Sequence, residues 1–213
     1  MDVSKRVIAR FCRYRNALMR FRQYGMKAIF SEELAQALGL TSAQVRKDFS
    51  IFKIPGKKKA GYRIDQLMKQ FDRILDKTHV QHVVILGAGP MGLALVKDPF
   101  LADRGINVSA IFEEEKKTPG LPAQIEGIPI LPISKLVAFV RSECIRYCVV
   151  AATDNSAQRM LDEAIISGVR GVLNLTPFEL KVPKSCTMNS VNLVAEIENL
   201  VFFTQNKIKT AVK

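Results

Sequence analysis

The feature that most constrains the fold is the stretch Val83-Val84-Ile85-Leu86-Gly87-Ala88-Gly89-Pro90-Met91-Gly92. Four β-prone apolar residues lead into three glycines with G-x-G-x-x-G spacing, and an apolar helical pattern follows at once. Between a buried strand and a helix, this spacing is typical of a dinucleotide cradle, although a glycine-rich turn without a ligand is the alternative. The glycines allow a tight turn, close approach to a pyrophosphate and close packing of the helix. The predicted cofactor contacts are Gly87, Ala88, Gly89, Pro90, Met91 and Gly92, with Pro90 in the first helical turn.

The chain after these glycines alternates strand and helix patterns, which predicts a doubly wound parallel sheet. The expected strands are 83–86, 107–112, 127–131, 146–151 and 171–175. Glu113 ends the second strand about twenty residues after the glycines, where a carboxylate holds the ribose 2′-hydroxyl of NAD and repels the 2′-phosphate of NADP. Thr153, Asn174 and Thr176 follow the fourth and fifth strands, and we expect them to line the same cleft. Asp154 or Asn155 is expected to cap the next helix.

Positive charge is concentrated in the first part of the chain. Residues 1–79 hold 18 Lys and Arg against 7 Asp and Glu, a net charge of +11, whereas residues 80–213 hold 14 against 13. An excess this concentrated implies a polyanionic partner for the N-terminal part, either nucleic acid or an anionic membrane face. We place the domain boundary between Asp76 and Gln81.

A helix-turn-helix pattern lies inside this basic segment. A basic amphipathic helix over 4–24, which carries Arg13, precedes a helix over 31–38 that Ser31 caps and Gly39 ends. Thr41 and Gln44 form a capping box for the next helix, which turns Val45 and Phe49 inward. Its other face carries residue types that contact bases and phosphates in a major groove. They are Ser42, Gln44, Arg46 and Lys47.

A basic hairpin is expected next, because Pro55 and Gly61 flank three consecutive lysines. Such a wing would hold Lys57, Lys58, Lys59 and Tyr62 toward phosphates or a minor groove. A solvated basic loop is the alternative. Asp65 is expected to cap a helix over 67–75.

The end of the chain carries an apolar helical pattern over 191–205 that is too rich in apolar residues for a lone surface helix. It predicts burial against a second surface, hence a dimer. No apolar run is long enough to span a bilayer and no signal core precedes the basic start, so we expect a cytoplasmic protein. His79 and His82 have no clustered ligands, and we expect no metal site.

At this point a family resemblance becomes specific. The chain resembles the bacterial redox-sensing transcriptional repressors called Rex over nearly its full length. The segments that carry the resemblance are Ser31–Asp48, Gly56–Tyr62, Val84–Gly89, Gly168–Pro177 and Leu180–Pro183. The resemblance implies a winged-helix domain joined to a Rossmann domain, a homodimer with the last helix swapped into the partner, and DNA binding gated by NADH versus NAD.

The chain departs from the family pattern at three places. The family usually has Asp where this chain has Asn192, and often has Tyr where it has Asp98. In the family these two positions link cofactor state to dimer geometry, so we assign Asp98 and Asn192 to ligand–dimer coupling. The third departure, in the wing, keeps the positive charge. The first two leave open a different ligand, ATP, ADP or a CoA-like molecule, or a weak response to NADH.

The leading interpretation is a homodimeric regulator, expected to be a repressor, that binds an inverted-repeat operator in double-stranded DNA and senses NADH and NAD without consuming them. The alternative from another class is an NAD-dependent dehydrogenase with a basic accessory domain. Hydride transfer needs an acid or base beside the nicotinamide, and no such pair follows the fourth or fifth strand, so we expect no catalytic residue and no enzyme. The expected fold class is α/β: 1–79 winged helix, 80–187 Rossmann-type sheet, 188–207 dimerisation helix and 208–213 basic tail.

Overall fold

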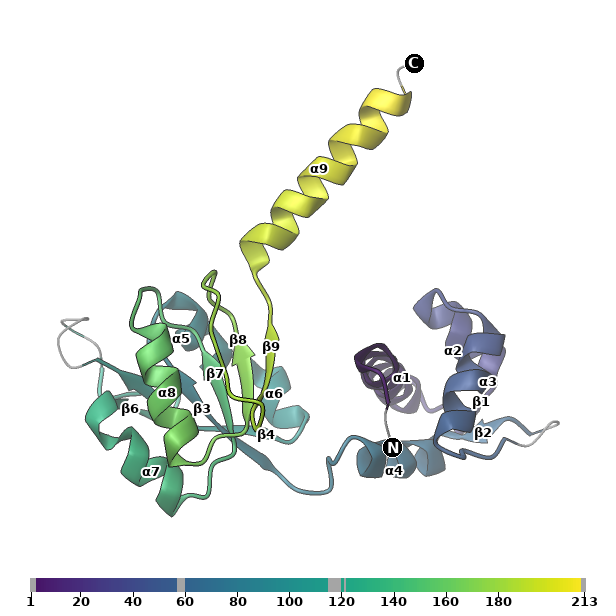
Figure 1. Cartoon of the computed structure of the whole chain (residues 1–213). Coiled ribbons are helices and arrows are strands. Elements are labelled where there is room, and N and C mark those ends of the chain that lie inside the picture. Colours follow the sequence, from purple (N-terminus) through teal and green to yellow (C-terminus); the bar gives the residue numbers. More distant parts are fainter. Residues whose placement is uncertain (1–2, 57–59, 115–119, 121, 212–213) are drawn as a thin grey trace. The chain divides into compact units, whose positions relative to one another are not determined.

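The computed structural model describes residues 3–56, 60–114, 120 and 122–211, and only the backbone of 208–211. The chain divides into two compact units, Met1–His79 and Val80–Lys213, which are described separately (Figure 1).

The first unit is a helical domain with a two-stranded sheet. Its elements are α1 (Lys5–Gln23), β1 (Ala28–Ile29), α2 (Ser31–Leu38), α3 (Ser42–Ile51), β2 (Tyr62–Arg63) and α4 (Ile64–Ile74). The centre of its core is aromatic, since Phe11, Tyr14, Phe49 and Phe71 are fully buried and their rings meet edge to face or tilted. Four helices and a small sheet around one core form the expected winged-helix fold.

Two helix starts in this unit differ from the prediction. Phe30, not Ser31, is the N-cap of α2, because the Glu33 carboxylate accepts the Phe30 N–H at 2.7 Å and Ser31 already lies in the helix. Likewise Arg63 precedes α4 and Asp65 lies in its first turn, where its charge favours the helix without capping it.

The wing also differs in its strand pairing. β2 pairs antiparallel with β1, Ala28 opposite Arg63, so the strand that ends the wing is joined to the segment between α1 and α2. In the described part of the wing, residues 53–56 and 60–61 form no strand. The predicted tip, Lys57, Lys58 and Lys59, lies outside the described residues.

The second unit is a sheet with helices on both faces. It starts with β3 (Gln81–Leu86), α5 (Pro90–Val96), α6 (Pro99–Asp103), β4 (Ile106–Glu113), β5 (Gln124–Ile125) and β6 (Ile128–Pro132). It continues with η1 (Ile133–Lys135), α7 (Leu136–Ser142), β7 (Tyr147–Val150), α8 (Ala157–Ser167), β8 (Gly171–Asn174), β9 (Thr187–Ser190) and α9 (Leu193–Ala211).

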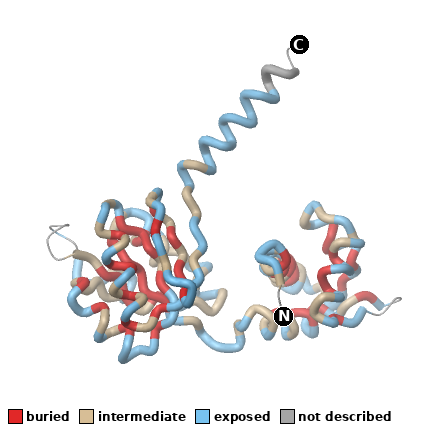
Figure 2. Tube along the Cα trace, viewed as in Figure 1, coloured by how far each residue is buried: buried red, intermediate tan, exposed pale blue. Residues whose placement is uncertain are grey.

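The strand order is β5-β6-β4-β3-β7-β8-β9, and every pair except β5–β6 is parallel. From β6 to β9 the strand order is that of a doubly wound sheet. In such a sheet the order of the strands reverses at the first strand, which here is β3. Alternate residues of β3 face opposite layers: Val84 and Leu86 pack with α7 and α8, whereas Val83 and Ile85 pack with the α5 side. Figure 2 shows the buried strands between exposed helix faces.

Several elements of this unit differ from the prediction. The helical pattern expected after the glycines forms two short helices, because Pro99 has no N–H to continue α5 and Asp98 caps α6 instead. The strands β5 and β9 were not predicted. The last helix begins at Leu193 and extends past 205.

The large apolar side chains of α9 are exposed. Leu193, Val194, Ile197, Leu200 and Phe203 have exposed fractions between 48% and 66%. A helix with this much uncovered apolar surface needs a second surface to bury it. None of the described helices is long and apolar enough to cross a bilayer.

Candidate dinucleotide cleft and nucleic-acid interface

The glycine loop lies at the reversal point of the sheet. It connects β3 to α5, with β4 on one side of β3 and β7 on the other. Open α/β sheets bind ligands at this point, outside the carboxyl ends of the strands, because the connecting loops diverge there. The predicted cradle therefore stands where this fold forms a crevice.

At each of the three glycines of the loop, a side chain would meet a different neighbouring atom. Gly87 has φ +105°, and a Cβ there would stand 2.4 Å from the Ala152 nitrogen after β7. A Cβ on Gly92 would stand 2.3 Å from the Gly87 carbonyl oxygen, so α5 packs directly on the loop. A Cβ on Gly89 would stand 2.8 Å from the Thr153 methyl and 3.4 Å from the Ala151 carbonyl oxygen, an ordinary contact distance. Gly89 is thus the position at which a side chain would fill the cradle without striking the backbone.

The helix behind the loop is short. Pro90 occupies its first turn, as predicted, and α5 ends at Val96 after seven residues. A helix of two turns has a smaller dipole than a longer helix, so it attracts a phosphate at its N-terminus less strongly.

Glu113 is held against the glycine loop. Its Oε2 accepts the Ala88 N–H at 2.7 Å and its Oε1 accepts the Glu114 N–H at 2.8 Å. The carboxylate thus stands at the end of β4 beside the cradle, the position from which this fold holds a ribose 2′-hydroxyl.

Thr153 lies beside Gly89, whereas Asn174 and Thr176 have other partners. Asn174 and Thr176 are buried, with exposed fractions of 1% and 3%. The Asn174 Oδ1 accepts the Thr176 N–H at 2.9 Å and its hydroxyl at 2.7 Å, and the Asn174 amide donates to the Phe178 carbonyl at 3.0 Å. We therefore reassign Asn174 and Thr176 from the ligand to the turn that ends β8.

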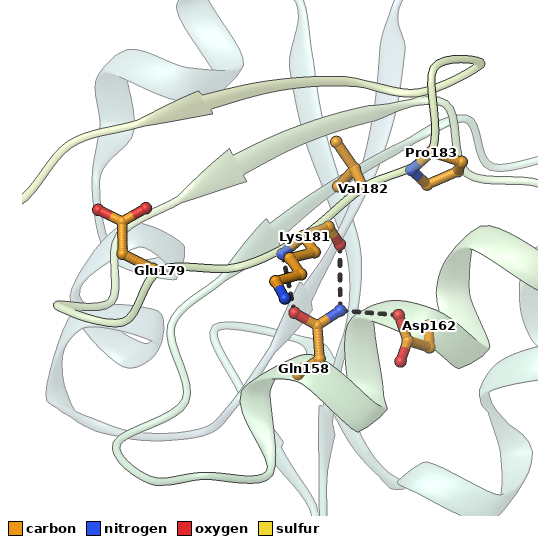
Figure 3. Close-up of a pocket in the computed structure, with 6 residues that line it drawn as sticks. All are labelled: Gln158, Asp162, Glu179, Lys181, Val182 and Pro183. Carbon is orange, nitrogen blue, oxygen red and sulfur yellow. Dashed lines mark hydrogen bonds between the residues drawn. The ribbon is translucent and has the colours of Figure 1, made fainter.

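A pocket lies beside α8, between it and the segment after β8 (Figure 3). Gln158 lines this pocket: its amide donates to Asp162 Oδ1 at 2.8 Å and to the Lys181 carbonyl at 3.1 Å, and its Oε1 accepts the Lys181 N–H at 2.8 Å. These bonds fasten the segment after β8 to α8. Since they use the polar atoms of Gln158 internally, we assign this pocket a structural role.

The helix-turn-helix of the first unit is formed by α2 and α3. Gly39 ends α2 in the left-handed region, with φ +65°, and the Thr41 hydroxyl accepts the Gln44 N–H at 3.1 Å to start α3. The other half of the predicted capping box is not formed, because the Gln44 side chain donates to Asp48 Oδ1 at 2.8 Å.

The outward face of α3 exposes two of the four predicted contacts. Arg46 and Lys47 are exposed, whereas Ser42 and Gln44 are half-buried. The Arg46 guanidinium donates to Glu32 Oε1 at 3.0 Å and to the Ser31 hydroxyl at 3.2 Å. Both side chains of the Arg46–Glu32 pair are more than half exposed, so the pair is free to exchange with another anion.

The remaining predicted contacts support the motif from its sides. Arg13 of α1 is exposed and donates to the Leu38 carbonyl at 2.7 Å, where it favours the C-terminal end of α2. The Tyr62 ring packs edge to face on Phe49 with centroids 5.0 Å apart, and burial raises the pKa of Tyr62. Tyr62 thus anchors the base of the wing.

A buried carboxylate that the sequence analysis missed joins α1 to α3. Asp48 is 1% exposed. Its oxygens accept two bonds from Arg10, at 2.5 and 2.7 Å, one from the Tyr14 hydroxyl at 2.8 Å, and one from Gln44. Burial opposes the charge on Asp48, but these hydrogen bonds outweigh it and hold the pKa of Asp48 below its ordinary value.

Asp98 and Asn192 are both helix caps. Asp98 Oδ1 accepts the Phe100 N–H at 2.9 Å at the start of α6. Asn192 Oδ1 accepts the N–H groups of Val194 and Ala195, at 3.1 and 3.2 Å, at the start of α9. Within one chain each side chain sets the start of a helix.

Comparison with known proteins agrees with both units. Residues 2–50 match the family model described as "Putative DNA-binding protein N-terminus", and residues 78–178 match that of a CoA binding domain. The redox-sensing transcriptional repressor Rex of Levilactobacillus brevis is 32% identical over 178 residues, which are 84% of this chain and 83% of that protein. The chain belongs to the Rex family. The Rex of Streptomyces coelicolor is also 32% identical, over 96% of this chain and 79% of its own.

Solved structures of the Rex family share the fold. RSP, described as a Rex-family repressor, superposes with a TM-score of 0.85 at 24% identity, over 100% of this chain and 99% of its own. RSP in complex with β-NAD⁺ and operator DNA superposes with a TM-score of 0.89, also at 24% identity, over 100% of this chain and 97% of its own. The winged helix, the doubly wound sheet and the last helix are thus the Rex-family fold.

Proposed function

We propose that the protein is a dimeric transcriptional repressor that binds an inverted-repeat operator through α3 and the wing, and whose affinity for the operator depends on NADH and NAD bound at the glycine loop. The observation that carries the proposal is the glycine loop at the reversal point of the sheet, with Glu113 fixed beside it, in a chain whose other unit is a basic winged helix. Relatives at 32% identity are redox-sensing transcriptional repressors.

The cradle suits a dinucleotide in two respects. Gly89 leaves room next to Thr153, where any Cβ would intrude, and the Glu113 carboxylate is available to a ribose. In the proposed site Gly87, Ala88, Gly89, Pro90, Met91 and Gly92 face the pyrophosphate, Glu113 takes the adenosine ribose, and Thr153 lines the opposite wall. When bound, NADH or NAD supplies the redox state that is sensed.

The proposed output is the geometry of the dimer. Two α3 helices on a two-fold axis would enter successive major grooves, with Arg46 and Lys47 on bases and phosphates. The exposed apolar side chains of α9 supply the surface for a second copy. A ligand that shifts operator occupancy tenfold needs about 1.4 kcal/mol of differential affinity between two dimer states. Asp98 and Asn192, which set the starts of α6 and α9, are the proposed coupling positions.

We further infer that the cleft has no catalytic role. His82 lies near the amino end of β3, opposite the glycine loop, and its Nδ1 is 3.2 Å from both the Ser109 hydroxyl and the Asn107 amide. Among the described residues no group of His, Cys, Asp and Glu is suited to hold a metal ion. Because a repressor must reach chromosomal DNA, we infer that the protein acts in the cytoplasm.

An operator-binding titration with NADH, NAD, ATP and no ligand tests the proposal. We expect NADH to change the affinity for the operator at least tenfold relative to NAD, roughly 1.4 kcal/mol, and ATP to have no effect. The G89V variant, whose side chain fills the cradle, should bind the operator like the ligand-free protein at every NADH concentration. Equal affinity in all four conditions would refute ligand gating, and a response to ATP alone would favour an adenine-nucleotide sensor.

Releasing Arg46 from Glu32 should strengthen operator binding. In E32Q the guanidinium no longer has a carboxylate competitor, and one negative charge is removed next to the DNA-binding face. Exposed pairs contribute little, so we expect an increase in affinity of roughly threefold, measured by fluorescence anisotropy at low salt. D65N is the matched control, since Asp65 is exposed on α4 and loses the same charge. An unchanged affinity for E32Q would contradict this prediction, and a weaker affinity would show that the pair positions Arg46 for DNA.

A further inference from the structure

An ion pair crosses the sheet beside the glycine loop. Arg159, in the first turn of α8, contacts the Glu114 carboxylate through Nη2 and Glu163 Oε1 through Nη1, the latter at 3.1 Å. Glu114 follows the last residue of β4, while α8 follows β7, and β3 lies between those two strands. The Arg159–Glu114 pair therefore joins the two sides of the crevice past the end of β3.

The two neighbouring carboxylates at this edge have different partners. Glu113 is bound to the Ala88 N–H of the loop, whereas Glu114 is bound to Arg159. The Glu114 side chain is 18% exposed and that of Arg159 is 55% exposed. The carboxylate is thus fixed within the protein, while the guanidinium remains within reach of a ligand.

Selectivity between NAD and NADP in this fold depends on this edge. A carboxylate at the end of the second strand accepts the ribose 2′-hydroxyl of NAD, whereas NADP sites provide an arginine for the 2′-phosphate. This chain has both residue types, but its arginine is occupied by Glu114 and Glu163.

Building on the NAD(H) site proposed above, we propose that Glu114 withholds Arg159 from the 2′-phosphate of NADP(H) and so makes the cleft selective for NAD(H). Two effects act together. The Glu114 charge adds to that of Glu113 and repels a phosphate. In addition, Nη2 and Nη1 of the guanidinium, which would bind two phosphate oxygens, already contact the Glu114 and Glu163 carboxylates. Arg159 is thus a latent phosphate-binding residue.

The test compares the affinities of NADH and NADPH for the full-length protein by calorimetry. In E114Q, Arg159 is released, and we expect the ratio of NADPH to NADH affinity to rise about tenfold, as for one charge-assisted pair gained. In R159Q that ratio should not rise. The double variant E114Q/R159Q should lose most of the gain, because the residue that binds the phosphate is gone. E163Q is the matched control: it removes the same charge from Arg159 but leaves Glu114 in place, so its ratio should stay near that of the wild type.

The outcomes separate this inference from the function on which it rests. An unchanged ratio in E114Q would overturn the proposal, and a double variant that kept the full gain would show that charge repulsion alone, without Arg159, sets the selectivity. A wild-type protein that bound neither nucleotide would overturn the NAD(H) site itself, and this inference with it. Circular dichroism of each variant would show whether the fold is kept.

Discussion

Reversing the charge of Arg46 is expected to abolish specific operator binding while the protein stays folded. Arg46 is exposed on the outward face of α3, and its contacts within the described residues are to Ser31 and Glu32 at the surface. An arginine that contacts a base or phosphate contributes about 1–3 kcal/mol, and a dimer on an inverted repeat loses it twice. In R46E we therefore expect the operator affinity to fall by about a hundredfold or more, measured by fluorescence anisotropy at fixed salt.

The control is R141E, which makes the same charge change at an exposed position on α7 of the other unit. It should bind the operator like the wild type, and thermal unfolding should be similar for all three proteins. The wild-type affinity should also fall by orders of magnitude between low and moderate salt, since phosphate contacts release counterions. A flat salt response, or equal losses in R46E and R141E, would contradict the assignment of α3 to DNA.

The sheet was predictable where burial dictates the residue pattern. The strands β3, β4, β6, β7 and β8 were all expected, because parallel strands in a sheet that helices cover on both faces carry runs of apolar residues. The strand β9 was missed because an edge strand has no such requirement, and Thr187, Asn189 and Ser190 are exposed and polar. The break between α5 and α6 could have been predicted from Pro99, which cannot continue a helix.

The site was predictable where its geometry is local. The roles of Gly87 and Gly92 follow from the path of the chain at one turn, and the structure confirms the close packing at both. The Asn174 side chain accepts hydrogen bonds from Thr176, two residues later in the chain. Asn commonly forms such a turn, and the prediction from strand ends alone did not consider it. The Arg159–Glu114 contact joins residues 45 positions apart and becomes visible only when the sheet order is known.

Asp48 carried a signal that the sequence analysis did not use. It follows Val45 by three positions and precedes Phe49 by one, so it stands on the inward face of a helix whose neighbours are buried. A carboxylate in such a position requires charged or hydrogen-bonding partners. They come from α1, Arg10 and Tyr14, and that pairing depends on how the two helices pack.

Removing the Asp48 carboxylate is expected to destabilise the first unit strongly. In D48A the Arg10 guanidinium and the Tyr14 hydroxyl lose their shared acceptor inside the core. Breaking a buried pair on one side costs about 3–5 kcal/mol, and the 21% exposure of the Arg10 side chain places this case near 3 kcal/mol. Amide hydrogen exchange over residues 5–74 should speed up by roughly a hundredfold, whereas exchange in the second unit should not change.

The matched control is D72A, which removes the partner of Arg15 in a pair whose carboxylate is 31% exposed and whose guanidinium side chain is 11% exposed. Water can reach the Asp72 carboxylate and Asp48 is 1% exposed, so D72A should destabilise the unit less than D48A does. Equal losses of stability in D48A and D72A would show that the buried Asp48 network stabilises the unit no more than the Arg15–Asp72 pair does.

Protonation of Asp48 is expected to lower the stability of the first unit in acid. Burial of Asp48 opposes its charge, but the bonds from Arg10, Tyr14 and Gln44 prevail and lower its pKa in the folded state. A lowered folded-state pKa means that the ionised carboxylate stabilises the unit above the unfolded pKa of about 3.9, and that this contribution is lost as the pH falls from there through the folded value. The wild-type unit should therefore lose stability below about pH 4, and D48N should lose less over the same range, because it has no proton to take up at this site. Thermal unfolding from pH 7 to pH 3 measures how much stability each protein loses. Equal losses in the wild type and D48N would show that other carboxylates cause the loss of stability in acid.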